Sequence, residues 1–433
     1  MNAARVCRCW LPALALWAAI TAWGQTVPSP ITGEMPAAGF GSAGKLTNLE
    51  LFSFTSSSTY DDNLSNSASQ HQGGAQQYLA ATFGFQQTRR RLRWNLSYRP
   101  GVVVGAHSLL GNQFNQVFGT TLQVQPTARW SLKLRQDYAL TTNPFDGLTE
   151  APLQPALGPL DRPNQLTLLP PLRRTASFTG AAVSYRLSRH NTVGLNGSYA
   201  LQNYSDYGAA WAGPLVNNRA ATASSYFSRQ LSRRSAFGVE YRLRRLTFPG
   251  LDQRALTHSV LSFYQFSLTA NSSIVVYTGP EYARTRGQTF AVRNAPAHSA
   301  SWSPAAGAMY IWSGIHNRLQ AGYSRQVSDG GGLQGPVRLN AGWLRVGRQL
   351  GRRWTADLGA ELAQQTALAA APGDRLRLLR CGPGFRRELG RNAVLLFSYD
   401  RLYQAGGSPL YRRGNHNRVA LSIEHSFMRP WGR

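Results

Sequence analysis

Arg229-Gln230-Leu231-Ser232-Arg233 and, a few residues later, Phe237-Gly238-Val239-Glu240-Tyr241-Arg242-Leu243 form a polar turn followed by alternating apolar and polar residues. Phe237, Val239 and Tyr241 would share one face, and the residues between them the other. An alternation with a period of two indicates a β-strand with one apolar face. The stretch therefore predicts a hairpin turn that leads into a strand with one apolar face.

The same turn phrase occurs in three other places. These copies are Arg186-Leu187-Ser188-Arg189, Arg348-Gln349-Leu350-Gly351-Arg352 and Arg387-Glu388-Leu389-Gly390-Arg391. A compact polar turn that recurs roughly every 40 residues is typical of hairpins on one rim of a large, repeated β-structure. The phrase thus predicts the topology of the chain as well as one local turn.

Other strand-like stretches also separate apolar from charged residues. Leu92, Trp94, Leu96 and Tyr98 alternate with a second set that begins at Arg93, and 130–135, 354–362 and 419–424 show the same pattern. An Arg or Lys that faces lipid near the membrane midplane costs about 2–4 kcal/mol. We therefore expect the charged faces to line a wet lumen.

Short turns alternate with longer loops along the chain. We predict turns near 87–91, 126–129, 188–191, 232–235, 269–272, 313–316, 351–353 and 390–392. The Gly-, Pro-, Asn- and Ser-rich loops are expected at about 57–77, 105–114, 142–174, 204–219, 247–254, 285–298, 329–334, 366–375 and 405–415. Eight turns and nine loops give about 18 strands, with 16 as the alternative.

An open sheet cannot cross a membrane, because every backbone N–H and C=O group in hydrocarbon must be paired. After the amino terminus, the chain has no run of about 18 apolar residues that could form a spanning helix. The expected fold class is therefore all-β: a transmembrane, antiparallel, up-and-down β-barrel with short periplasmic turns and long extracellular loops. Trp94, Trp130 and Trp354 would belong to interfacial aromatic girdles. A soluble β-sandwich with an aromatic core is the alternative.

The amino terminus has the features of a secretory signal peptide. Arg5 and Arg8 precede a short apolar core, and Ala22-Trp23-Gly24 provides a cleavage site. The predicted organisation is a signal peptide at 1–24, a periplasmic segment at 25–45, the barrel at 46–427 and a tail at 428–433. A retained anchor is the alternative for the first segment.

The formal net charge of +27 comes almost entirely from arginine. A strongly basic protein usually has a polyanionic partner. For an exported barrel these partners are lipopolysaccharide, anionic polysaccharide or anionic solutes, and we predict no nucleic-acid binding. Of the three cysteines only Cys381 lies beyond the signal peptide, so no intrachain disulfide is expected.

Two segments resemble a known family. Residues 49–54 run into Thr59-Tyr60-Asp61-Asp62-Asn63-Leu64, which resembles the opening of the outer-membrane β-barrel porin family. These are the porin-2-like barrels, including those associated with exopolysaccharide and exosortase systems. Val419, Leu421, Ile423 and Phe427 resemble the last strand of such proteins, which ends on an aromatic residue that the assembly machinery reads. Either Phe427 or Trp431 would serve as this signal.

No motif predicts catalysis, a cofactor or a metal site. The eight histidines are scattered without metal-ligand spacing, and no Gly-x-Ser-x-Gly elbow is present. Charged residues at expected lumen positions are the candidate site instead. They are Arg93, Arg99, Lys133, Arg135, Asp137, Glu240, Arg242, Arg244, Arg318, Arg338, Asp357, Glu361, Asp400 and Glu424.

Charged rings decide ion preference in pores, and the positive excess favours anions. Cross-strand pairing that only rigidifies the inner wall is the alternative. We therefore expect a non-enzymatic, porin-like channel for passive or weakly anion-selective diffusion of small solutes. The alternatives are a barrel component of exopolysaccharide export and a structural or adhesive surface barrel without an open pore. Outer-membrane lipid, lipopolysaccharide and the assembly machinery are the expected partners, and loop 142–174 is a candidate for constricting the lumen.

Overall fold

The computed structural model describes residues 48–64, 73–105, 112–142, 172–205, 215–287, 298–332, 335–368, 375–390, 392–406 and 414–430. The predicted signal peptide, the periplasmic segment and nearly all of loop 142–174 lie outside these ranges. The strands are β1 (Asn48–Asp61), β2 (Gly74–Arg89), β3 (Leu92–Gly105), β4 (Gln113–Val124), β5 (Trp130–Thr141), β6 (Arg173–Arg186), β7 (Asn191–Ser205), β8 (Asn218–Gln230), β9 (Ser235–Phe248), β10 (Gln253–Thr269), β11 (Ser272–Arg286), β12 (His298–Ser313), β13 (Asn317–Ser328), β14 (Val337–Gln349), β15 (Trp354–Ala367), β16 (Arg375–Glu388), β17 (Ala393–Gly406) and β18 (Gly414–Pro430).

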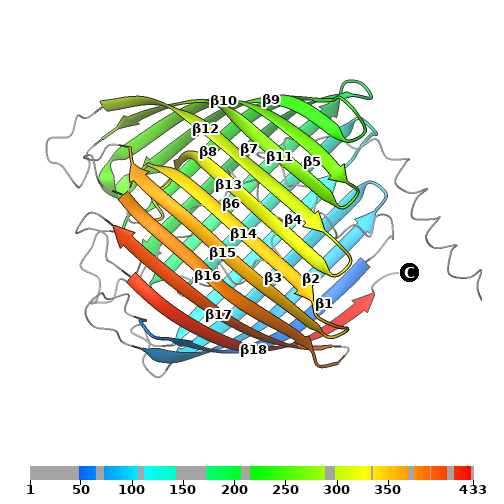
Figure 1. Ribbon diagram of the computed structural model, residues 1–433, viewed down its shortest axis with the longest axis vertical. Coiled ribbons are helices and arrows are strands. Elements are labelled where there is room, and N and C mark those ends of the chain that lie inside the picture. Colours follow the sequence, from blue (N-terminus) through cyan, green and yellow to red (C-terminus); the bar gives the residue numbers. More distant parts are fainter. Residues whose placement is uncertain are drawn as a thin grey trace, which may run out of the picture.

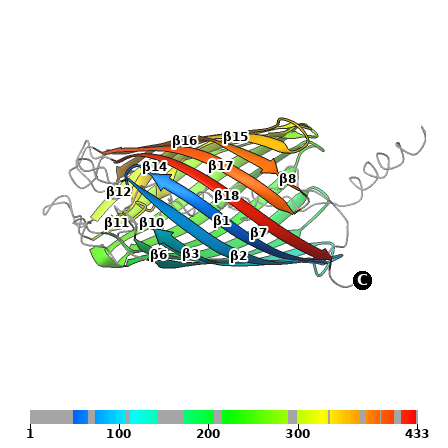
Figure 2. The same ribbon diagram turned by 90° about the horizontal axis from the view of Figure 1, so that it is seen from below.

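All strands belong to one 18-stranded antiparallel sheet, in which each strand pairs with its neighbours in the sequence. β1 also pairs with β18, from Leu49–Pro430 to Asp61–Arg418, and this pairing closes the barrel. Figures 1 and 2 show the tilted strands from two directions, with β1 beside β18. The predicted fold class and the count of 18 strands are confirmed. The described residues include no helix that is long and apolar enough to cross a membrane.

The repeated turn phrase closes four hairpins through the same backbone bond. The N–H groups of Leu187, Leu231, Leu350 and Leu389 each donate to the carbonyl four residues later, over 2.9–3.0 Å. All eight short turns predicted from the sequence are present, on the right-hand side of Figure 1, where β1 begins and β18 ends. We call this side the short-turn rim and the opposite side the long-loop rim.

The hydrogen-bonded ladder aligns the outward face of each strand with the outward faces of its two neighbours. The outward rows hold exposed apolar side chains, among them Phe52, Leu195, Leu358 and Leu421. The inward rows are rich in Ser, Thr, Asn, Gln, Gly and charged residues. This arrangement follows from the period of two, because a pleated strand sends successive side chains to opposite faces.

Large aromatic rings on the inner face lie over glycines of the neighbouring strand. A Cβ on Gly194 would meet the Tyr226 ring at 2.3 Å, one on Gly307 the Tyr277 ring at 2.4 Å, and one on Gly322 the Trp343 ring at 2.6 Å. Glycine in a strand often marks such a close approach. These rings therefore lie against the wall, where they take less room from the lumen.

The Tyr60-Asp61-Asp62-Asn63 motif fastens the closing pair of strands at the long-loop rim. The Asn417 N–H and side-chain amide donate to Asp62 over 2.7 and 2.5 Å. The His416 Nδ1 atom lies 3.1 Å from the Asp61 carboxylate. Asn63 donates to the same carboxylate from its N–H and to the Asn415 carbonyl from its side chain. The motif thus bridges two strands about 350 residues apart in the sequence.

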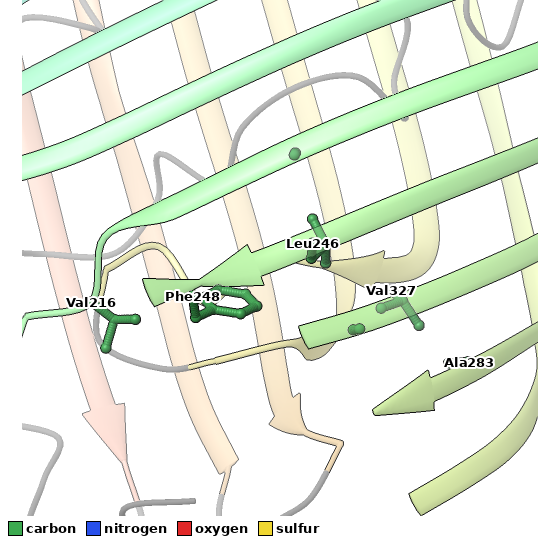
Figure 3. Close-up of a cluster of buried hydrophobic side chains, with 7 residues drawn as sticks. Val216, Leu246, Phe248, Ala283 and Val327 are labelled. Atoms are coloured by element: carbon green, nitrogen blue, oxygen red, sulfur yellow. The ribbon is translucent and has the colours of Figure 1, made fainter. Parts of the chain in front are cut away.

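β13 leaves the barrel wall before it reaches the long-loop rim. Its ladder with β12 ends at the pair Ala306–Arg325, although β12 continues along β11 as far as His298. Residues 324–332, which we call the inward segment, are almost all buried. Val327 packs with Leu246 and Phe248 of β9 inside the barrel, next to Val216 (Figure 3). The β12–β13 step is therefore the irregular point in the wall.

Candidate pore and its charged lining

The register places all but one of the predicted lumen residues on the inner face. The inward rows hold Arg93, Arg99, Lys133, Arg135, Asp137, Glu240, Arg242, Arg244, Arg318, Asp357, Glu361, Asp400 and Glu424. On this surface the barrel brings together residues from strands that are far apart in the sequence.

Arg338 is the exception, because the register puts it on the other row of the ladder. Its ladder partners are Val327 and Thr366, and it alternates with the buried inward residues Val337 and Leu339. It therefore lies on the outward row. At this end of β14 the apolar row of Val337, Leu339 and Ala341 faces inward, the reverse of the order in β3, β5 and β18.

Several inward charges were missed from the sequence. They are Arg174 of β6, Glu281 of β11, Arg345 of β14, Arg380 and Arg386 of β16, and Arg418 of β18. Arginine occurs on both faces of β16, with Arg375, Arg377 and Arg387 pointing outward. These faces are assigned by the pairing of β16 with β15. The alternation that starts at Trp354 of β15 is clear, and the ladder carries it over to β16.

The two halves of the lumen differ in how much of their lining is accessible. Toward the short-turn rim, the inward arginines Arg93, Arg318, Arg345 and Arg386 are exposed. Asp357 lies within electrostatic reach of Arg318 and Arg386. The short-turn half is therefore a wet surface with a positive excess.

From the middle of the wall toward the long-loop rim, several inward charges are buried or half-buried and pair with one another. Glu240 bonds Arg242 over 3.1 Å, and both side chains are buried. Arg135 donates from Nε to Asp137 over 2.5 Å and lies 5.6 Å from the Phe178 ring centre. Burying a charge is costly unless it is paired, so these contacts fix the side chains in place.

The inward segment is tied to the wall across from β13. The Val327 N–H donates to Glu281 over 2.9 Å, and Arg244 donates to the Val327 carbonyl over 3.1 Å. Farther along, Asn218 of β8 donates to Asp329 over 2.9 Å. Finally, the Val216 N–H donates to the Gly332 carbonyl over 2.8 Å. The segment therefore follows the inner wall from β13 as far as β8 and narrows the long-loop half.

No group of three or more His, Cys, Asp or Glu side chains in the described ranges could hold a metal ion. Cys381 is a free thiol on the outward row of β16. The charged lining and the inward segment are the candidate functional features of the barrel.

A closed barrel with an even number of antiparallel strands, an apolar outside and a polar inside is the architecture of bacterial outer-membrane proteins. The chain is an outer-membrane β-barrel. No protein-family model matches its sequence, and no curated protein does.

Solved structures similar to the chain come from two bacteria. Pseudomonas aeruginosa OpdQ is 10% identical, with a TM-score of 0.45 over 88% of this chain and 99% of that one. Acinetobacter baumannii OccAB1 is 9% identical, with a TM-score of 0.47 over 88% and 96%. Pseudomonas aeruginosa OprD is 10% identical, with a TM-score of 0.41 over 88% and 95%. No lumen residue is assigned from these similarities.

Proposed function

We propose that the barrel is a passive channel for small solutes with a weak preference for anions. The observation that carries this proposal is the wet lining of the short-turn half, where Arg93, Arg318, Arg345 and Arg386 are exposed on the inner face. Barrels of 16–18 strands are wide enough to leave an aqueous channel. A channel of this kind performs no covalent chemistry and needs no cofactor.

The preference for anions follows from where the charges are compensated. In the long-loop half, carboxylates bind arginines directly, as in Arg380–Asp400 at 3.0 Å. In the short-turn half, Asp357 faces both Arg318 and Arg386, so that one negative charge is shared by two positive ones. Fixed charges that line a pore raise the local concentration of counter-ions. The remaining positive excess therefore favours small anions.

Liposome swelling with solutes of matched size tests this function. Vesicles that contain the refolded barrel should swell faster in gluconate than in N-methylglucamine. The triple variant R93Q, R318Q, R386Q should lose most of this difference, because it removes exposed charge from the lining. The matched control R348Q changes an exposed, outward arginine near the same rim and should leave the ratio unchanged. Equal rates for the two solutes in the native barrel would refute the anion preference.

The inward segment favours a second candidate function, a barrel without an open pore that serves surface structure or polysaccharide export. Its ties to Glu281, Arg244 and Asn218 hold polypeptide within the long-loop half of the lumen. Under this second candidate, native vesicles would not swell with either solute. The paired variant E281A, D329A, which removes two of the ties, would then begin to admit both solutes.

Lipopolysaccharide, outer-membrane lipid and the outer-membrane assembly machinery are proposed partners. The aromatic side of the last strand supports contact with the assembly machinery, because Phe427 lies on the outward row and is exposed. It stacks near Phe52 of β1, with 6.3 Å between ring centres. Phe427 therefore lies where β1 and β18 meet, the pair that closes the barrel.

A further inference from the structure

A row of aromatic rings crosses the outer surface of β9, β10, β11 and β12. Its members are Tyr241, His258, Tyr282 and Trp302, and successive ring centres are 6.3, 6.4 and 5.0 Å apart. The row lies on the lipid side of the wall, because Tyr241 is the ladder partner of Val260, an outward residue that is 47% exposed. Aromatic side chains gather where the hydrocarbon of a membrane meets its head groups. The row therefore marks this boundary on the side nearer the long-loop rim.

Five arginines lie beyond the aromatic row, nearer the long-loop rim. We call them the outer arginine patch, and all five are exposed: Arg219 of β8, Arg245 of β9, Arg254 of β10, and Arg284 and Arg286 of β11. Their outward position follows from the register, in which Arg245 and Arg284 both pair with the exposed Leu256. The wall is regular here, since β8, β9, β10 and β11 stay paired up to these residues. The patch thus belongs to the outer surface and not to the lumen.

The patch lies at the height of lipid head groups. Arg284 is two residues past Tyr282, and Arg254 is four residues from His258 toward the long-loop rim. A strand rises about 3.3 Å per residue and is tilted by about 40°, so these steps correspond to about 5–10 Å along the membrane normal. The hydrocarbon boundary at the aromatic row therefore lies just below the guanidinium groups.

Like charges face each other within the patch. Arg254 and Arg286 are direct ladder partners, and like charges at opposite positions destabilise a sheet. From β8 to β11 the chain contains three acids, of which Glu240 and Glu281 are buried on the inner face and only Asp252, in the β9–β10 turn, is exposed. Within the described part of the chain, none of the five arginines forms an ion pair. The patch therefore carries a positive excess that attracts anions.

Phosphate is the anion that fits this place best. A guanidinium group donates two parallel hydrogen bonds to phosphate, and lipids carry their phosphates at the head-group level. The short turns of outer-membrane barrels face the periplasm, so the long-loop rim lies in the outer leaflet. The lipid there is lipopolysaccharide, whose lipid A anchor is phosphorylated. Its acyl chains would lie against the aromatic row, where Trp302 is 71% exposed.

We propose that the outer arginine patch binds the phosphates of lipopolysaccharide. Arg254 and Arg286 hold one phosphate between them, which relieves the repulsion of the facing pair, and the acyl chains pack along the aromatic row below. The inference rests on lipopolysaccharide as a proposed partner and names the surface that binds it. It does not depend on whether the pore conducts.

Native mass spectrometry of the whole barrel, released from detergent and titrated with bisphosphorylated lipid A, tests the proposal. We expect a saturable adduct that is weakened about tenfold in the R254Q, R286Q double variant, because two charge-assisted contacts are lost. The matched control R229Q, R348Q removes two outward, exposed arginines near the short-turn rim and should bind as the native barrel does. Both variants should conduct as the native barrel does, because these side chains lie outside the lumen.

Equal weakening in the two double variants would overturn the proposal, because net charge and not position would then govern binding. Unchanged binding in R254Q, R286Q would overturn it as well, as would equal binding of lipid A without phosphates. Competition by inorganic phosphate at the concentration of the lipid would also overturn it, because the patch would then be a site for a soluble anion.

Unfolding in urea gives a second readout that follows from the facing pair. In phosphatidylcholine vesicles R254Q should unfold at a higher urea concentration than the native barrel, because one of two opposed charges is gone. Addition of lipid A should raise the midpoint of the native barrel more than that of the variant. An equal gain for both would contradict the proposed site. The heat-dependent gel shift of folded barrels confirms that each variant is folded.

Discussion

At the scale of single residues, the charges that matter most are those whose partners the barrel brings from far along the chain. Asp61 and Asp62 are close in sequence to a polar loop, and nothing local indicates their role. In the folded barrel they hold His416 and Asn417, and so join the first strand to the last. The Tyr60-Asp61-Asp62-Asn63 motif, which resembles the opening of other barrels, therefore holds β1 and β18 together where the barrel closes.

Replacing Asp62 with alanine tests this role. Both hydrogen bonds to Asn417 disappear, and hydrogen bonds to a charged group contribute about 1.5–3 kcal/mol each, less where water reaches them. We expect the free energy of unfolding to fall by about 1–3 kcal/mol, measured by urea unfolding in lipid vesicles. Glu388→Ala, at an exposed position on the opposite rim, is the control. An unchanged urea midpoint for the Asp62 variant would show that the motif does not hold the seam.

At the scale of the strands, alternation predicted faces well where one side was uniformly apolar. The β3, β5, β15 and β18 faces were predicted correctly because tryptophan, leucine and valine recur at every second position. The β16 arginines could not be assigned to a face, since both faces of β16 mix apolar and charged residues. Around Arg338 the alternation is clear, but its apolar row faces inward. The inward turn of β13 could not be predicted from the local sequence pattern either, because it depends on contacts with β8, β9 and β11.

Engineered disulfides test the β12–β13 step in a Cys381→Ser chain that begins at Gln25. Ladder partners have Cα atoms about 4.5–5.5 Å apart, within the range that a disulfide spans. The pair Ile311→Cys and Gln320→Cys, within the ladder, should therefore cross-link on mild oxidation. The pair Ser303→Cys and Ser328→Cys continues the same register beyond the step.

We expect this second pair to stay reduced, because β13 has left β12 at this point. Both pairs are read out by mass after alkylation of the free thiols. Complete cross-linking at 303 and 328 would mean that the wall is regular here.

At the scale of the whole molecule, the barrel combines a regular wall with an asymmetric lumen. The wall follows from alternation and from turns, including the repeated arginine–leucine turn, and so could be predicted almost completely. The lumen depends on which inward charges find partners and on where the inward segment lies, and both are properties of the closed barrel. We therefore propose that the short-turn half selects anions, while the inward segment narrows the long-loop half.

Single-channel recording of the refolded barrel in a planar bilayer, under a salt gradient, tests the central claim most directly. We predict stable conductance steps, with a reversal potential of the sign expected for an excess of anion current. A barrel that is inserted and folded but persistently closed, or one whose reversal potential shows cation preference, would contradict the account.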